Sequence, residues 1–136
     1  MASSRSIALS ITIKATPREV FKALTDSKSI RRWSGQRARV EPTIGGRFEM
    51  FDGWVKGKVL AYENGKVLSY TWHPADWNAE TPSSIVRYKF SKSGRNTKVS
   101  LAHTGFPNAA SKKEHQAGWK EHVFSPLKDF FESRKR

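Results

Sequence analysis

Hydrophobic and polar residues alternate over residues 5–14, where Ile7, Leu9, Ile11 and Ile13 stand at every second position. A period of two predicts a strand with one buried face. Further strand-like segments follow at residues 37–41, 47–51, 54–62, 66–73, 84–90 and 98–104. Turn dipeptides separate several of them, at Asp52-Gly53, Asn64-Gly65 and Ser93-Gly94. Because such short turns join antiparallel neighbours, the segments predict an antiparallel sheet.

Two short helices are predicted between the first strand and the others. Thr16 and Glu19 have the spacing of a capping box, and Pro17 lies between them at the first helical position. Asp26 has the position of an N-cap for a second short helix, which carries Trp33. The chain therefore leaves its first strand through helical structure before the other strands begin.

A long helix is predicted at the C-terminal end of the chain. Ser111 and Glu114 repeat the capping-box pattern, so we expect this helix to begin at Ser111. Its apolar face is expected to comprise Trp119, Val123, Leu127 and Phe130. Pro126 lies inside the helix and has no N–H to donate, so we expect a kink there.

This order of elements predicts an α+β fold in which a curved antiparallel sheet is wrapped around the long C-terminal helix. The length of 136 residues fits a single domain, residues 1–136. Strand alternation directs one set of side chains into the space between sheet and helix: Phe48, Met50, Leu68, Tyr70, Trp72, Val86, Tyr88, Phe90, Val99, Leu101 and His103.

The composition narrows the function classes. The formal net charge is +13, from 25 Lys and Arg against 12 Asp and Glu, which favours acidic partners. The chain has no Cys, so disulfides and thiolate chemistry are excluded, and we expect a cytoplasmic monomer. No apolar run approaches the roughly 20 residues that a membrane-spanning helix needs.

Motifs in order along the chain carry a family resemblance. They are Trp33, GGRF at 45–48, Asp52-Gly53, LSYTW at 68–72, HTGFP at 103–107 and HQAGW at 115–119. From Ile11 to about Phe131 the sequence resembles the Hsp90 ATPase-activator homologue family of the START-like, helix-grip superfamily. The resemblance implies a helix-grip fold and a non-enzymatic, co-chaperone-like module whose partner is an Hsp90-type chaperone.

START-like relatives bind lipids or small hydrophobic molecules between sheet and helix, which gives a second hypothesis, a ligand carrier or sensor. The candidate cavity residues in this chain are Phe48, Met50, Tyr70, Trp72, Tyr88, Leu101, His103 and Trp119. Four of these side chains combine a large apolar surface with a polar group, as ligand pockets require. The alternative is that they only fill the core.

A search for catalytic motifs finds no phosphate-binding glycine loop, no zinc-protease histidine pair and no nucleophile elbow, so we expect no enzyme. His103 either orients a ligand or acts as a general base, or it is a structural histidine bonded to a backbone carbonyl in the core. His115 and His122 lie about 10.5 Å apart along a helix axis. Zinc–nitrogen bonds of about 2 Å cannot span that separation, and we expect neither a metal nor a cofactor.

Basic side chains form a candidate partner-binding surface that comprises Arg31, Arg32, Arg47, Lys56, Lys58, Arg87 and Lys89. One hypothesis is contact with an acidic protein, such as an Hsp90-type chaperone. A third hypothesis is that this surface binds nucleic acid or an anionic surface. The structural alternative is a solvated basic face that keeps the protein soluble.

Overall fold

The structure is a computed structural model that describes residues 6–133. Strands in this range are β1 (Ser6–Ile13), β2 (Arg39–Val40), β3 (Arg47–Met50), β4 (Val55–Glu63), β5 (Val67–Pro74), β6 (Ser84–Ser93) and β7 (Asn96–Thr104). Helical segments are α1 (Pro17–Thr25), α2 (Ser27–Ser34), α3 (Ala109–Gly118), η2 (Trp119–Phe124) and α4 (Ser125–Ser133). The predicted first strand began at Arg5, which lies outside the described residues.

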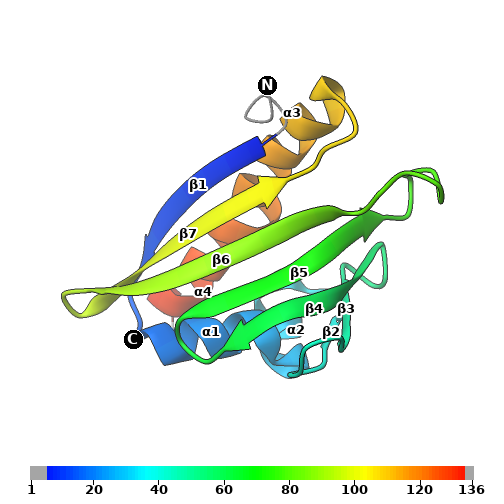
Figure 1. The fold of residues 1–136 in the computed structure, drawn as a ribbon. Helices are drawn as coiled ribbons and strands as arrows, with labels where there is room; N and C mark the ends of the chain where they lie inside the picture. The colour runs from blue at the N-terminus through cyan, green and yellow to red at the C-terminus, as the bar shows by residue number, and fades with distance from the viewer. Residues whose placement is uncertain (1–5, 134–136) are drawn as a thin grey trace.

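The strands form one sheet in the order β1-β7-β6-β5-β4-β3-β2, and every neighbouring pair is antiparallel (Figure 1). β1 and β2 are the two edge strands. α1 and α2 carry the chain from β1 at one edge to β2 at the other. The strands from β2 to β7 then follow one another across the sheet and are joined by turns and loops. The predicted antiparallel sheet and the two short helices after the first strand are therefore confirmed.

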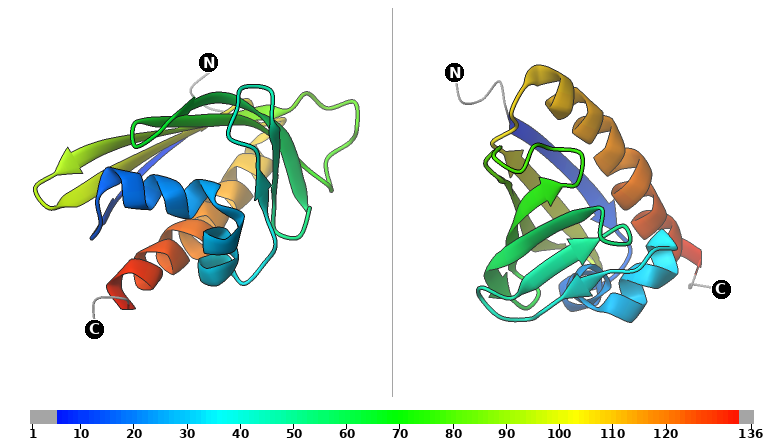
Figure 2. Two further views of the ribbon diagram at one scale, coloured as in Figure 1. Left: turned by 90° about the horizontal axis from the view of Figure 1, so that it is seen from below. Right: turned by 90° about the vertical axis from the view of Figure 1, so that its right-hand side faces the viewer.

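The sheet curves around the C-terminal helix, which crosses its concave face (Figure 2). Every side chain that alternation directed inward is buried, from Phe48 on β3 to His103 on β7. The helix adds Trp119, Val123 and Leu127 to the same core. This is the predicted helix-grip fold of the α+β class. No helix among residues 6–133 is both long and apolar enough to cross a membrane.

Side-chain caps fix the start of both short helices, as predicted. Thr16 Oγ1 accepts a hydrogen bond from the Glu19 N–H, and the Glu19 carboxylate accepts one from the Thr16 N–H. The Asp26 carboxylate accepts a hydrogen bond from the Ser29 N–H at 3.1 Å and so caps α2. α2 ends at Gly35, whose φ of 76° lies in the left-handed region that glycine tolerates.

The predicted capping box at Ser111 is wrong. The helix begins at Ala109, and the N-cap is Asn108, whose side-chain oxygen accepts a hydrogen bond from the Ser111 N–H at 2.8 Å. Asn is a strong N-cap residue, and the two alanines that follow it favour helix, so the helix starts earlier than the capping-box spacing predicts. Ser111 therefore lies inside the first turn, and its buried hydroxyl has no hydrogen-bond partner among residues 6–133.

The C-terminal helix contains a π-helical segment, η2, directly before the turn that carries Pro126. Pro126 has no N–H for the carbonyl one turn earlier, and the chain widens in the preceding turn, where the sequence predicted a kink at the proline itself. The buried stripe of α4 continues from Leu127 to Phe131, four residues on. Phe131 is 2% exposed, whereas Phe130, which we expected on the apolar face, is only half-buried.

β2 is shorter than predicted, with two residues in place of the segment 37–41. Near each end of β2, a backbone N–H group donates to a side-chain carboxylate and not to a neighbouring strand. The Arg37 N–H donates to the Asp52 carboxylate at 2.7 Å, and the Glu41 carboxylate accepts from the Arg47 N–H at 2.9 Å. The sheet therefore ends in a short edge strand, which limits pairing with another chain.

Candidate functional site

A cleft of about 450 Å³ opens where the β3–β4 turn and the β5–β6 loop meet the C-terminal helix. Aromatic side chains dominate its lining, with carboxylates and histidines among them. The lining residues are Phe51, Trp54, Trp72, Asp76, Trp77, Glu114, His115, Ala117, Gly118, Trp119, Glu121, His122 and Val123. Trp72 and Trp119 are the two predicted cavity residues that line this cleft.

The other six predicted cavity residues lie deeper, in the core between sheet and helix. They are Phe48, Met50, Tyr70, Tyr88, Leu101 and His103, and each is at most 2% exposed. The Phe48 and Tyr70 rings stack with centroids 3.6 Å apart. Burial raises the pKa values of both Tyr70 and Tyr88, whose side chains lie close to each other.

His103 lies behind the cleft and is held by hydrogen bonds on both ring nitrogens. The Trp119 indole N–H donates to Nδ1 at 2.9 Å, so the neutral ring carries its proton on Nε2. Nε2 lies 2.7 Å from Ser84 Oγ and donates to it, and the Ser84 hydroxyl donates to the Trp72 carbonyl. Burial lowers the pKa of His103 to about 2, with a smaller contribution from nearby His115. His103 is thus a neutral side chain that orients Trp119.

His115 is held in the same way but in the opposite tautomer. The Trp72 indole N–H donates to Nε2 at 3.1 Å, so the proton is on Nδ1, which donates to the Ser111 carbonyl at 2.9 Å. Burial lowers the pKa of His115. Because an indole N–H occupies the lone pair of each imidazole, neither His103 nor His115 has a free nitrogen to accept a proton from a substrate.

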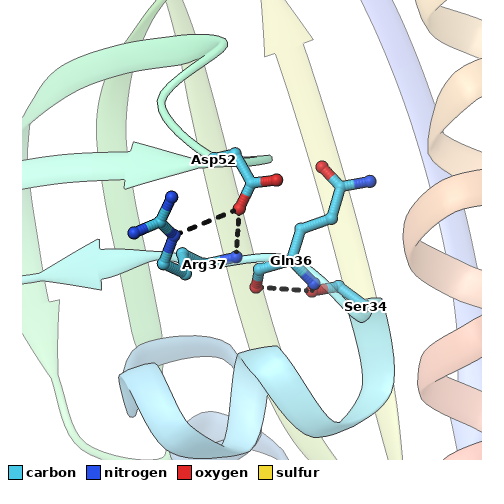
Figure 3. A network of polar contacts seen from close by, with 4 residues as sticks. All are labelled: Ser34, Gln36, Arg37 and Asp52. Carbon is cyan, nitrogen blue, oxygen red and sulfur yellow. Dashed lines mark hydrogen bonds and ion pairs between the residues drawn. The ribbon is translucent and has the colours of Figure 1, made fainter.

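The turn that carries Phe51 into the cleft has a strained backbone. Phe51 and Asp52 have φ angles of 55° and 57°, in the left-handed region that residues with a side chain seldom adopt. The Arg37 N–H donates to the Asp52 carboxylate, and Arg37 Nε lies 3.7 Å from the same oxygen (Figure 3). The Asp52 N–H donates back to the Arg37 carbonyl. These contacts hold the turn, and with it Trp54, against the segment that follows α2.

Trp54 and Trp77 are site residues that the sequence reasoning missed. Both rings approach His115, with centroids at 6.3 Å and 5.8 Å. Trp54 is 40% exposed, which is unusual for a tryptophan beside a cleft with an apolar floor. The available signal was their position: each indole lies in or beside a turn, outside the alternating strand pattern that placed the core.

The seven residues of the predicted basic surface are all exposed, but they lie in three places. Arg31 and Arg32 are on α2. Arg47 faces Lys58 across β3 and β4, and Lys56 is close by on β4. Arg87 and Lys89 are on β6, and among the described residues none of the seven forms an ion pair.

The surroundings of these cations differ. Arg32 lines a groove that also contains the carboxylates of Glu121 and Asp129, so acidic groups lie near it. Arg87 and Lys89 instead line a shallow hollow on the outer face of the sheet, above small side chains of β1 and β7 such as Ala8, Ser10, Ser100 and Ala102. The five cations on β3, β4 and β6 are called the sheet-face cations below.

Residues 6–133 contain no group of three or more His, Cys, Asp or Glu side chains that is arranged to hold a metal ion. The site consists of an aromatic cleft with the fixed neutral His115 in its lining and His103 behind it, and of separate basic surfaces outside the cleft.

A curved antiparallel sheet around a long C-terminal helix, with a cleft at one end of the helix, defines a helix-grip protein of the START-like class. The family model described as "Activator of Hsp90 ATPase homolog 1-like protein" matches residues 14–132. The chain belongs to this family.

Curated relatives carry related names. The "Activator of 90 kDa heat shock protein ATPase homolog 1" of Mus musculus is 25% identical over 125 residues, which are 92% of this chain and 36% of the relative. The "Hsp90 co-chaperone AHA1" of Saccharomyces cerevisiae is 29% identical over 109 residues, 76% of this chain and 31% of the relative. The chain thus spans about a third of the length of these relatives.

Solved structures show the same architecture. An HSP90 activator from Plasmodium falciparum superposes with a TM-score of 0.85 at 25% identity, covering 93% of this chain and 95% of that one. A protein from Mesorhizobium loti superposes with a TM-score of 0.77 at 24% identity, covering 95% of this chain and 98% of that one, and supports the fold alone.

Proposed function

We propose that this protein is a non-enzymatic binding module that contacts an Hsp90-type chaperone through its sheet-face cations. The observation that carries the proposal is the match to the Plasmodium falciparum structure, because a chain of nearly the same extent is there described as an HSP90 activator. The names of the mouse and yeast relatives support the same partner.

The chemistry of the outer sheet face supports this partner class. Arg47, Lys56, Lys58, Arg87 and Lys89 are exposed and form no ion pair within residues 6–133, so their charges are available to carboxylates of a partner. Charge complementarity of this kind mainly raises the rate of association and is screened by salt. The occupied lone pairs of His115 in the cleft and of His103 behind it support a binding role over a catalytic one.

Charge reversal tests the surface. We expect Arg87→Glu/Lys89→Glu and Arg47→Glu/Lys58→Glu each to weaken binding to a purified Hsp90-type chaperone at least tenfold at low salt, with much smaller losses at high salt. Binding is measured by interferometry across a series of salt concentrations. Lys113→Glu/Lys120→Glu is the matched control, since it changes the net charge equally on exposed helical positions.

Two outcomes would redirect the proposal. Equal losses for the control pair would mean that net charge alone matters and that no surface is specific. Tight, salt-dependent binding of the unmodified protein to RNA, without binding to the chaperone, would favour the nucleic-acid hypothesis for the same face, because phosphate contacts lose affinity steeply with salt.

A second candidate function, a carrier or sensor of a small apolar molecule, is favoured by one specific observation. The cleft has a volume of about 450 Å³, within the range of small-molecule sites, and its aromatic lining includes the exposed indole of Trp54. Native mass spectrometry of gently purified protein tests it. A discrete co-purifying molecule near unit stoichiometry supports the candidate, and a protein that carries no such molecule and takes up no added ligand contradicts it.

A further inference from the structure

The cleft has a charge opposite to that of the protein around it. Lys and Arg outnumber Asp and Glu by 25 to 12 in the chain, yet within the described residues the lining contains Asp76, Glu114 and Glu121 and no Lys or Arg. Asp76 and Glu114 lie close enough to act on the imidazole of His115, because their negative charges partly offset the lowering of its pKa by burial. The carboxylates of Asp76 and Glu114 therefore lie near His115 in the lining, although both residues are exposed.

The second feature is the kind of apolar surface. Trp54, Trp72 and Trp77 surround His115, and Phe51 closes the side formed by the strained turn. The faces of aromatic rings attract cations, and tryptophan does so most strongly. Trp54 is 40% exposed, so part of its ring surface remains uncovered by its neighbours.

Of the two histidines in the lining, His115 lies among the tryptophans and does not supply a positive charge there. His115 Nε2 accepts the Trp72 indole N–H, and a proton there would break that hydrogen bond. His122 is exposed and lies beside Glu121, with Nε2 3.8 Å from its carboxylate, so Asp76 and Glu114 are the carboxylates beside the tryptophans that have no basic partner within the described residues. An anionic ligand would meet carboxylates and no Lys or Arg in this lining, and a neutral apolar one would leave their field unused.

We propose that this cleft binds a small organic cation, in which an ammonium or quaternary ammonium head is attached to an apolar body. The head lies among the tryptophan faces with Asp76 and Glu114 beside it, and the body lies along Trp119 and Val123. The inference rests on the second candidate function, that the cleft holds a small molecule, and adds the chemical class of that molecule.

Three probes with one apolar body and different heads test the inference: phenylpropyl-trimethylammonium, phenylpropanol and phenylpropanoate. Binding to the full-length protein is followed by NMR titration of the tryptophan indole N–H signals, which report on the cleft directly. We expect the cation to bind about tenfold more tightly than the alcohol, and the carboxylate to bind most weakly.

Variants locate the source of the preference. Asp76→Asn/Glu114→Gln is expected to reduce the preference for the cation over the alcohol to less than threefold. The matched control is Glu63→Gln/Glu80→Gln, which removes the same charge from exposed positions outside the cleft and is expected to keep the preference. Trp54→Leu keeps an apolar side chain and removes the ring face, so it should weaken the cation more than the alcohol.

The outcomes separate the inference from the function on which it rests. Tighter binding of the cation, lost in the cleft double variant and kept in the control, supports it. Equal binding of cation and alcohol overturns the cationic ligand class and leaves the carrier candidate standing. If no indole N–H signal shifts with any probe, both the cationic ligand class and the carrier candidate are overturned. If the two double variants lose the preference for the cation equally, overall charge causes the preference and its assignment to the cleft is overturned.

Discussion

At the scale of single residues, the central feature is a pair of histidines whose protons are fixed by tryptophan indoles. Trp119 donates to Nδ1 of His103, and Trp72 donates to Nε2 of His115, so both imidazoles are neutral and in opposite tautomers. Each bond joins a sheet residue to the C-terminal helix. The histidines therefore connect the two layers of the fold by directional contacts in addition to apolar packing.

We expect His103→Leu to lower the free energy of unfolding by about 2–4 kcal/mol, because the buried Trp119 indole N–H loses its acceptor. Urea denaturation measures the loss. Trp119→Phe removes the donor and keeps an aromatic ring, so in a double-mutant cycle the double variant should be less destabilised than the sum of the two single variants. Additive losses would contradict the hydrogen bond.

The neutral histidines make stability depend on pH. Burial lowers the pKa of His103 to about 2, whereas the same side chain in the unfolded chain titrates near 6.5. Between these values the unfolded state binds a proton that the folded state does not. The contribution of neutral His103 to the free energy of unfolding is therefore complete above pH 6.5. It is lost as the pH falls below that value, by at most about 1.4 kcal/mol per pH unit.

Urea denaturation at a series of pH values between 7 and 4 measures this dependence, with unfolding followed by tryptophan fluorescence. His103→Leu is the control, since it removes the more deeply buried of the two titrating histidines and should reduce the slope of the curve. A stability that is constant over this pH range in the unmodified protein would contradict the buried neutral histidine.

At the scale of elements, Gly57 in β4 and Gly118 in the C-terminal helix differ in the space that is available for a Cβ atom. A Cβ on Gly57 of β4 would lie 1.8 Å from the carbonyl oxygen of Thr71 on β5, so the strands would have to separate. A Cβ on Gly118 meets nothing closer than 3.9 Å, at His122. Gly118 also has helical φ and ψ angles.

We expect Gly57→Ala to destabilise the protein by about 3 kcal/mol and Gly118→Ala to stabilise it by about 0.5–1 kcal/mol. Thermal and urea unfolding of both variants measure the two effects. Opposite signs for the same chemical change are the diagnostic result, and a neutral Gly57→Ala would contradict the close approach of β4 and β5.

Strand alternation and helix caps were sufficient to predict the elements, because period and capping are local properties. Thr16, Asp26 and the inward set from Phe48 to His103 lie as their patterns indicated. The start of the last helix was predicted wrongly although its signal is local, since Asn108 caps the helix earlier than the Ser111 spacing indicated. The π-helical turn and the burial of Phe131 in place of Phe130 were not predicted, because they depend on packing between residues distant in sequence. Trp54 and Trp77 were missed as site residues for the same reason: only the folded loops bring them to His115.

At the scale of the whole molecule, charge is divided between two surfaces. The outer sheet face carries cations without partners among the described residues, and the cleft at the end of the helix is lined by three carboxylates and no Lys or Arg. The two proposals assign a large acidic partner to the first surface and a small cation to the second. The two proposals therefore stand on different residues and can fail independently.

The measurement that tests the central proposal most directly is the ATP turnover of a purified Hsp90-type chaperone with and without this protein, in parallel with their binding. We predict a salt-sensitive complex and a change in turnover that Arg87→Glu/Lys89→Glu abolishes and Lys113→Glu/Lys120→Glu preserves. The absence of both a complex and a change in turnover at low salt, with the unmodified protein folded, would contradict the proposed function.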